Sequence, residues 1–569
     1  MSSKIDHRRL ARLRRGQGEI ANHVIDEFAA GRLSRRDFIR RASVVGISVP
    51  LVGSILEACS SSSSSGSSGS TSPGSSSSAT GAPGAVIRAG ITTPAAAINP
   101  VTVADQGGLD MLAQTGEYLV LSDQTLNLKP VLATSWSSNA KADVWTFKIR
   151  QGVKFHNGAP LTADDVVYSF KLYTGPKSAA LSALGGVLSP DGVQKVDEAT
   201  VAFHLAAPNG SFPYLISSDN YNTIIIPNNY DPTKWQSSFL GTGPFVLSSY
   251  TPKQGASFTR NESYWGTKAL PSQTQFTFYD TQPPSILALT GGNIDVLGQF
   301  SVTGGEALLG GNYNVIKLKS SAHRELSMRC DQAPFNDPRV RQAIALTLNR
   351  PQIVTALFKG LSDLGNDSPF APVFPSTNTS IAQRAQNIAQ AKSLLAAAGH
   401  PNGFSTTLVT ENIQEIPTFA QIVAESAAAI NVKINLNVEA QSKYYGNFEF
   451  GTSDWLDGTM SLVDYGHRGV PNVFLGAPLQ TINAKAGTGP WNAAHFNNSQ
   501  YDTLFAQYVS APDVSSQRTI AGQIETLLLA QTPIIYAYFY NYLTATAQGV
   551  TGVYPTAIGH LFLQNAAKS

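Results

Sequence analysis

A run of serine and glycine near the start of the chain divides it into two unequal parts. Residues 60–84 are almost entirely Ser, Gly, Thr, Pro and Ala, whereas the remainder holds an ordinary mixture of apolar and charged residues. Such a run buries too little apolar surface to offset the entropy lost on ordering. We therefore expect residues 60–85 to form a disordered tether, with every folded domain in residues 86–569.

The segment ahead of the tether has the features of a bacterial export signal. Arg35 and Arg36 precede a short, mildly apolar run that ends directly before Cys59. This run is shorter than the roughly 20 apolar residues of a membrane span. Paired arginines before such a run are typical of a twin-arginine signal. The sequence LEAC matches a lipoprotein cleavage box, although Glu57 is an unusual residue there, so residues 1–59 predict export and lipid attachment at Cys59.

The rest of the chain is nearly neutral. Residues 1–59 hold 11 of the 40 Lys and Arg residues and 6 of the 38 Asp and Glu residues, which leaves 29 basic and 32 acidic residues beyond them. Nucleic-acid binding requires clustered positive charge, so we predict no nucleic-acid partner. Two cysteines and nine scattered histidines provide no metal framework, so we predict no metal and no cofactor.

Segments with strand periodicity alternate with segments with helix periodicity beyond the tether. Residues 144–150 alternate apolar and polar side chains as a strand does. Thr162 and Asp165 have the spacing of a capping box at the start of a helix. Strands are also predicted at 406–410 and 431–439, on either side of a further helix. A strand, helix, strand order indicates an α/β fold.

Five segments, in this order and at this spacing, resemble one protein family. They are LATSW from 132, TFKIRQGVKFHNGAPLTADDVVYSF from 146, GTGPFVL from 241, APFNDPRVRQAIALTLNR from 333 and AKSLLAAAGHPNGF from 391. Each is ordinary alone, but together they resemble the extracellular solute-binding proteins, family 5, of ABC importers for peptides, opines and nickel chelates. The resemblance extends from residue 86 to the C-terminus.

The resemblance implies a two-lobed α/β fold of the class II periplasmic-binding-protein type, which closes on a small solute. Lobe I would comprise residues 86–130, 240–320 and 545–569, with an inserted subdomain at 131–239. Lobe II would comprise residues 321–544.

The sequence LVDYGHRG is the best candidate for ligand contact. By resemblance, Asp464 matches an acid that pairs with the free amino group of a ligand, and Leu462 matches a residue that offers backbone groups. A carboxylate in a dry cleft suits ammonium because charge-assisted hydrogen bonds are strong. GHRG departs from the shorter turn of many relatives, and its His467 and Arg468 are predicted either to recognise a carboxylate or to pair with Asp464. The alternatives are an Asx turn for Asp464 and a structural ion pair for Arg468.

Further contacts are predicted on neighbouring segments. Trp491 and Asn492 would supply an apolar wall and an amide, although a tryptophan packs more often in a core. Tyr444 and Tyr445 match aromatic residues that relatives place near the pocket. The loop at 105–108 is also expected to face the cleft.

These observations predict a monomeric, lipid-anchored receptor on the outer face of the bacterial cytoplasmic membrane. It would bind a peptide or another amine-bearing solute and deliver it to an ABC permease and its ATPase. A sensory receptor would have the same binding site, so the sequence leaves that alternative open. A hydrolase is disfavoured and we predict no enzyme activity, because the chain has neither GxSxG nor HExxH and no cysteine nucleophile in a suitable context.

Overall fold

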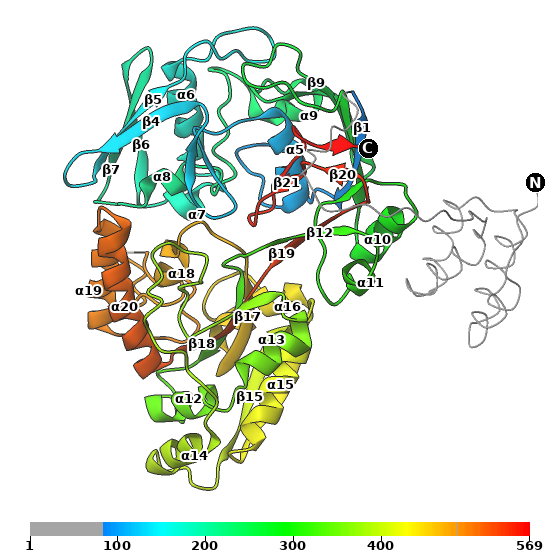
Figure 1. Cartoon of the computed structure of the whole chain (residues 1–569). Helices are drawn as coiled ribbons and strands as arrows, with labels where there is room; N and C mark the ends of the chain where they lie inside the picture. The colour runs from blue at the N-terminus through cyan, green and yellow to red at the C-terminus, as the bar shows by residue number, and fades with distance from the viewer. Residues whose placement is uncertain (1–83, 486) are drawn as a thin grey trace, which may run out of the picture.

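The computed structural model describes residues 84–485 and 487–569, which form two lobes, one above the other in Figure 1. Cys59, the arginine pair Arg35 and Arg36, and residues 60–83 of the predicted tether lie outside the described residues. Within the described part of the chain, no helix has both the length and the apolarity needed to cross a bilayer.

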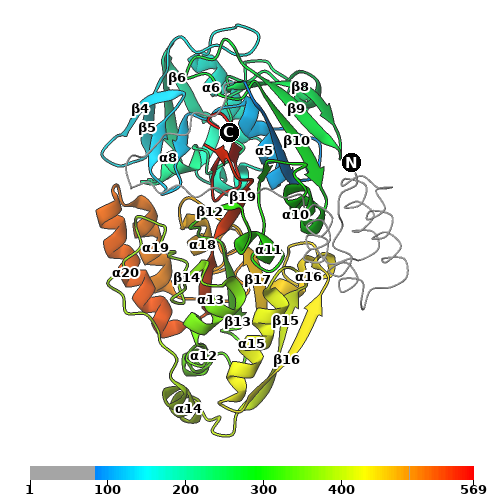
Figure 2. The same ribbon diagram turned by 45° about the vertical axis from the view of Figure 1, so that its right-hand side comes forward.

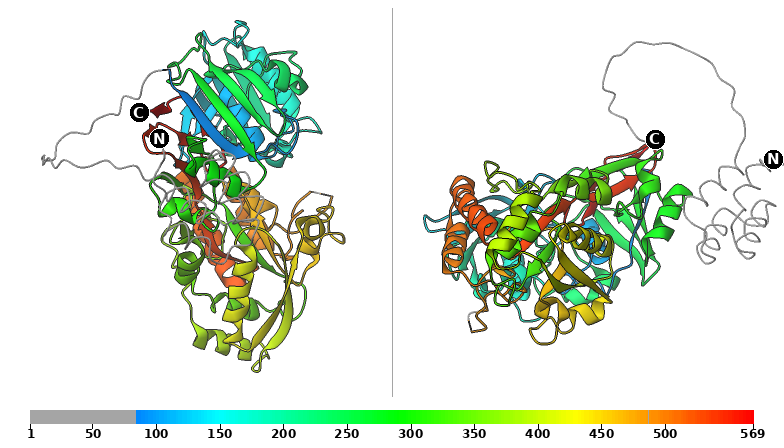
Figure 3. Two further views of the ribbon diagram at one scale, coloured as in Figure 1. Left: turned by 90° about the vertical axis from the view of Figure 1, so that its right-hand side faces the viewer. Right: turned by 90° about the horizontal axis from the view of Figure 1, so that it is seen from below.

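The upper lobe is built on a mixed seven-stranded sheet, which the left view of Figure 3 faces. β1 (Val86–Thr92) lies in its middle and pairs in parallel with β10 (Gln273–Tyr279) and β11 (Val296–Leu297). Alternate residues of β1 point to one face, so Ile87, Ala89 and Ile91 are buried in the core. The full order is β12 (Asn314–Leu318), β19 (Tyr542–Thr546), β11, β1, β10, β9 (Gly255–Arg260) and β8 (Phe245–Thr251). Helices α5 (Gln106–Thr115) and α10 (Gln282–Thr290) contact β1.

A separate four-stranded sheet stands beside it in the same lobe. Its order is β4 (Ala133–Ser138), β5 (Val144–Ile149), β7 (Thr200–Leu205) and β6 (Leu188–Asp197). Trp145, Phe147 and Ile149 alternate along β5 and share a second core with α6 (Ala163–Tyr173). The predicted strand at 144–150 is confirmed. The predicted capping box at Thr162 and Asp165 is also confirmed.

The lower lobe contains a six-stranded sheet. Its order is β14 (Ser362–Leu364), β18 (Ile534–Tyr540), β13 (His323–Met328), β17 (Met460–Tyr465), β15 (Phe404–Glu411) and β16 (Val432–Glu439). β15 and β16 are parallel and joined by α15 (Ile416–Ala428), which Figure 2 shows beside them, so the predicted strand, helix, strand unit is confirmed. Every residue of β13 is buried. The other long helices are α12 (Pro338–Ala345), α13 (Arg350–Phe358), α14 (Ile388–Ala397), α19 (Ser499–Ser510) and α20 (Val514–Gln531).

The chain crosses between the two large sheets at two neighbouring points. β12 leads to β13 through residues 319–322, and β18 leads back to β19 through Asn541. β12 pairs with β19 in one sheet while β13 pairs with β18 in the other, so the crossings lie side by side. Such paired connections form a hinge in proteins whose lobes close around a ligand. The divisions at 320 and 544 and the inserted subdomain at 131–239 stay predictions of domain organisation.

The lobes also touch at a second place, where α8 (Phe212–Leu215) lies above α19 and α20 in Figure 1. The Gly210 backbone N–H donates to the Val509 carbonyl over 3.0 Å. The Gln517 amide donates to the Ser211 hydroxyl over 3.0 Å. The space between the lobes is therefore bounded by the hinge on one side and by this contact on another.

Candidate functional site

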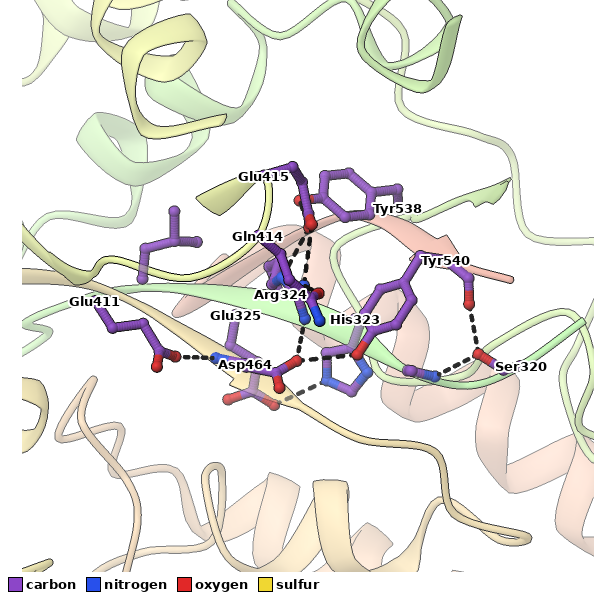
Figure 4. Close-up of polar contacts among 12 residues, drawn as sticks. Ser320, His323, Arg324, Glu325, Glu411, Gln414, Glu415, Asp464, Tyr538 and Tyr540 are labelled. Atoms are coloured by element: carbon purple, nitrogen blue, oxygen red, sulfur yellow. Dashed lines mark hydrogen bonds and ion pairs between the residues drawn. The ribbon is translucent and has the colours of Figure 1, made fainter. Parts of the chain in front are cut away.

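Asp464, the predicted ligand acid, lies in β17 directly opposite Arg324 of β13. The antiparallel register brings the two side chains together, and the Arg324 guanidinium forms an ion pair with Asp464 Oδ1 (Figure 4). His323, the first residue of β13, follows the crossing from lobe I. The ion pair therefore lies at the edge of lobe II that is nearest to the hinge.

Arg324 is fully buried and is held by several acceptors. Its Nε donates to Glu415 Oε1 over 2.9 Å, and an Nη donates to Gln414 Oε1 over 2.7 Å and to Glu415 Oε2 over 3.1 Å. The guanidinium lies over the Tyr540 ring, 4.4 Å from its centroid. Burial alone would lower its pKa, but the carboxylates of Asp464 and Glu415 raise the pKa of Arg324 well above its ordinary value. Arg324 is thus a fixed cation.

The Asp464 carboxylate is partly exposed to solvent at the edge of lobe II that is nearest to the hinge. Its Oδ1 accepts hydrogen bonds from Arg324 and from the Tyr540 hydroxyl, the latter over 3.0 Å. Its side chain is nevertheless 30% exposed, whereas that of Arg324 is 0% exposed. An incoming polar group can therefore reach Asp464 but not its buried partner.

Carboxylates outnumber cations in this cluster. Asp464 and Glu415 form ion pairs with the single guanidinium of Arg324, and Glu411 lies next to Asp464 (Figure 4). Glu411 is buried, accepts from the Asp464 backbone N–H over 3.3 Å and accepts from the Tyr445 hydroxyl over 2.8 Å. Three carboxylates beside one guanidinium leave an excess of negative charge, which favours a cationic group on a ligand.

Two cavities flank Tyr540 between the lobes. The larger, of about 200 Å³, is lined by Gln414, Glu415 and Tyr540 together with residues of β1, β10 and α10 from lobe I. The smaller, of about 130 Å³, is lined by Tyr540, by Gly466 and by Gln106 of lobe I. Gln106 begins helix α5, so residues 105–108 are the start of a helix and not the loop that we expected. Neither lining contains Lys or Arg. Within residues 84–485 and 487–569, no group of three His, Cys, Asp or Glu residues is arranged to hold a metal ion.

Leu462 lies two residues before Asp464 in β17, but it is fully buried in the lobe II core. Its carbonyl accepts from the Thr410 hydroxyl and from the Tyr444 hydroxyl, both over 2.8 Å. These contacts use both lone pairs of the oxygen that we expected to face an extended ligand.

Trp491 and Asn492 lie in different surroundings although they are adjacent in sequence. The half-buried Trp491 ring packs against Trp455 and Tyr465, with both centroid distances at 6.3 Å. Asn492 is fully buried, and its Nδ2 donates to the carbonyls of Gln480 and Phe496 while its Oδ1 accepts from the Phe496 N–H. Trp491 therefore belongs to an aromatic cluster, and the Asn492 amide shapes its own loop.

The loop that contains His467 and Arg468 reaches towards lobe I. Buried His467 accepts the Ser321 N–H at Nδ1 over 2.9 Å, and burial lowers its pKa to about 3, so it is neutral. Arg468 is half-buried, and its guanidinium donates to the His467 carbonyl over 2.8 Å. A Cβ at Gly469 would lie 1.8 Å from Oδ2 of Asp219 in lobe I, so only glycine fits this approach. We predicted, as one alternative, that His467 or Arg468 pairs with Asp464. This alternative is wrong, because Arg324 forms the ion pair with Asp464.

Sequence reasoning missed Arg324, Glu415 and Tyr540, which complete the cluster around Asp464. They come from three segments, and Arg324 is 140 residues from Asp464 along the chain. The only local signal is the adjacent charged pair of Arg324 and Glu325 in the sequence HREL. The register between β13 and β17 is what brings them together.

Comparison with known proteins supplies the family. The model described as "Bacterial extracellular solute-binding proteins, family 5 Middle" matches residues 127–467. The chain belongs to this family. The family 5 protein is 24% identical over 444 residues to heme-binding protein A of Haemophilus influenzae, covering 72% of this chain and 78% of the relative. It is 26% identical over 484 residues to the periplasmic murein peptide-binding protein MppA of Escherichia coli, covering 78% and 86%.

Solved structures share the fold. HbpA2 from Haemophilus parasuis has a TM-score of 0.74 at 22% identity and covers 85% of this chain and 100% of that structure. The predicted two-lobed α/β fold and the predicted family are both confirmed. The relatives are named as binding proteins for ligands as different as heme and murein peptides, so membership of family 5 does not by itself identify a ligand.

Proposed function

We propose that this family 5 protein is a receptor that binds a small amine-bearing solute, such as a short peptide, between its lobes. The observation that carries the proposal is the Asp464 carboxylate, which is 30% exposed and belongs to a cluster of excess negative charge. Two members of that cluster, Glu415 and Tyr540, line the larger cavity between the lobes. An ammonium group there would gain charge-assisted hydrogen bonds in a partly desolvated site. Relatives named for dipeptides and murein peptides support a peptide ligand.

Arg468 would form an ion pair with the carboxylate of such a ligand. It forms no ion pair with any described residue, and its own loop contacts lobe I. It lies four positions after Asp464, with three residues between them, so chain reach limits their Cα atoms to about 14 Å apart. The amino and carboxyl ends of a short peptide fit within that span.

The other predicted site residues would support the site in different ways. Tyr445 would position Glu411 behind Asp464, and Trp491 would provide an apolar wall. We assign Leu462 and Asn492 to the framework of the site, because their polar groups are already bonded within lobe II.

We further propose that the protein is a monomer held at the outer face of the cytoplasmic membrane by a lipid on Cys59, after export through the Arg35 and Arg36 signal. It would deliver its solute to an ABC permease and its ATPase. The tether would raise the local concentration of receptor at that partner. Replacement of Cys59 by Ala is expected to release the protein from the membrane fraction; a variant that stays with membranes would exclude the lipid anchor.

The ligand is tested by thermal shift on the full-length protein. The panel contains dialanine, trialanine, putrescine, glucose and a nickel chelate, with N-acetylated peptides as matched controls. A compound that binds only the folded form raises the melting temperature, so peptides with a free amine are expected to do so and their acetylated forms are not. Equal stabilisation by acetylated and free peptides would show that the free amine is not recognised. Hydrolysis of panel members without any rise in melting temperature would indicate an enzyme in place of a receptor.

A further inference from the structure

The two oxygens of the Asp464 carboxylate are in different states. Oδ1 accepts from the Arg324 guanidinium and from the Tyr540 hydroxyl, so both of its lone pairs are in use (Figure 4). Oδ2 accepts from no described residue, and the side chain is 30% exposed. One oxygen is therefore closed by the protein and the other is open to a ligand.

The donors to Oδ1 are held in place. Arg324 is 0% exposed, both oxygens of Glu415 accept from it, and Gln414 accepts a further hydrogen bond. The Tyr540 ring lies against the guanidinium, and the Tyr540 carbonyl is itself fixed by the Ser320 hydroxyl. Breaking this arrangement would leave buried charge without partners, which is strongly unfavourable.

Neither Glu415 nor Glu411, the two other carboxylates of this cluster, offers a free oxygen. Glu415 Oε1 accepts from Arg324 and from the Tyr538 hydroxyl, and Oε2 accepts from Arg324. Glu411 Oε1 accepts from Tyr445, and Oε2 accepts from the Gln441 amide. Both residues are buried. A ligand at this edge of lobe II therefore meets one available carboxylate oxygen.

We infer that Arg324 sets ligand selectivity by making Asp464 a single-oxygen acceptor, so that the site accepts an ammonium group and discriminates against a guanidinium group at the same position. An ammonium is a compact charge that bonds one oxygen well. A guanidinium is a planar fork whose strong contact with a carboxylate uses both oxygens. Arg324 and Tyr540 already use both lone pairs of Oδ1, so a guanidinium would find only Oδ2 free. This inference rests on the proposed amine receptor and narrows its ligand class.

Isothermal titration of the full-length protein with matched ligands tests it. The pairs are dialanine and trialanine with their N-guanidinylated forms, which have no free amine. N,N-dimethylated trialanine is the size control, because it keeps the charge and one N–H donor while adding bulk. We expect at least tenfold weaker binding of the guanidinium form of a pair, and a smaller loss for the dimethylated peptide. Equal affinity within the pairs would overturn the inference but leave an amine receptor, whereas no binding of any amine would overturn both.

Variants separate selectivity from folding. The double variant Arg324→Met with Glu415→Gln frees one lone pair of Oδ1, the one that Arg324 uses, without leaving an unpaired buried carboxylate. It is expected to reduce the preference for ammonium to threefold or less. Tyr540→Phe keeps the ion pair and frees one lone pair of Oδ1, so a partial reduction is expected even if the double variant does not fold. A preference that stays unchanged in Tyr540→Phe and in a folded double variant would contradict the role of Arg324.

Discussion

Glu117 in lobe I and Asp464 in lobe II are two carboxylates that differ in their hydrogen-bond donors and in their exposure to solvent. Glu117 is buried and accepts from three neutral donors, namely the Tyr264 hydroxyl over 2.6 Å, the Trp265 indole over 2.8 Å and the Thr242 hydroxyl over 2.7 Å. Burial raises the pKa of Glu117, and these hydrogen bonds oppose the rise. Asp464 instead has a buried cation on one oxygen and solvent access at the other.

The difference shows how to distinguish a structural carboxylate from a binding one. Both oxygens of Glu117 are satisfied within the protein, so the group joins segments that are 125 and 147 residues away and has nothing left to offer a ligand. Asp464 keeps an unsatisfied acceptor in a place that a solute can reach. Burial alone would single out Glu117, whereas the donors to each carboxylate oxygen favour Asp464 as the proposed ligand contact.

The largest expected effect is on the stability of the Glu117 cluster. Glu117→Ala leaves the hydroxyls of Tyr264 and Thr242 and the Trp265 indole without their acceptor, so we expect the free energy of unfolding to fall by about 3–5 kcal/mol. Urea denaturation followed by tryptophan fluorescence measures the change. Peptide affinity of the folded fraction is expected to stay the same. If Glu117→Ala left the free energy of unfolding unchanged but weakened peptide binding, Glu117 would have the binding role that we assign to Asp464.

Asp464→Asn is expected to act on binding instead. The amide keeps an oxygen for Arg324 and Tyr540 but loses the charge, so affinity for an amine ligand such as trialanine should fall 10- to 100-fold, about 1.4–2.8 kcal/mol. The melting temperature should change little. Glu425→Gln is the matched control, because it removes one acidic charge from the exposed face of α15 in the same lobe. Equal losses in both variants would point to long-range charge rather than to contact.

Asp219 offers an intermediate case between these two carboxylates. Its buried Oδ2 lacks a hydrogen-bond partner and faces Gly469 across the lobes, and burial, with a contribution from Asp123, raises the pKa of Asp219 to about 7. The folded state therefore binds the proton more tightly than the unfolded state, so this contribution to stability is present below about pH 4 and is lost as pH rises through 7. Asp219→Asn should be about 1–2 kcal/mol more stable than the parent at pH 8, with no gain at pH 4. Denaturation curves at both pH values test the sign.

The smallest effect compares one hydroxyl in each cluster. Tyr264→Phe leaves Glu117 Oε1 buried without its donor and is expected to cost about 1.5 kcal/mol. Tyr540→Phe leaves Asp464 Oδ1 with Arg324, so it should cost about 0.5 kcal/mol. A difference of about 1 kcal/mol between the two variants supports the distinction between closed and open carboxylates. Equal losses of unfolding free energy in the two variants would mean that solvent access at Asp464 does not compensate for the missing Tyr540 hydroxyl.

Local features predicted the elements well. The alternation of Trp145, Phe147 and Ile149 predicted β5, and the spacing of Thr162 and Asp165 predicted the start of α6. The site was predicted only in part. Asp464 was identified through resemblance, but the contacts of Leu462 and Asn492 with backbone and core depend on segments that no local pattern connects to them.

The sequence by itself determined the family, the α/β architecture and the presence of an acid at position 464, because periodicity, turn residues and motif order are properties of short segments. Only the tertiary structure decided what that acid can do. The pairing of β13 with β17 carries Arg324 across 140 residues to one oxygen of Asp464, and the loop before α15 supplies the Glu415 that fixes it. Strand register over such a distance depends on packing of the whole lobe, and it leaves the second oxygen of Asp464 without a donor from any described residue.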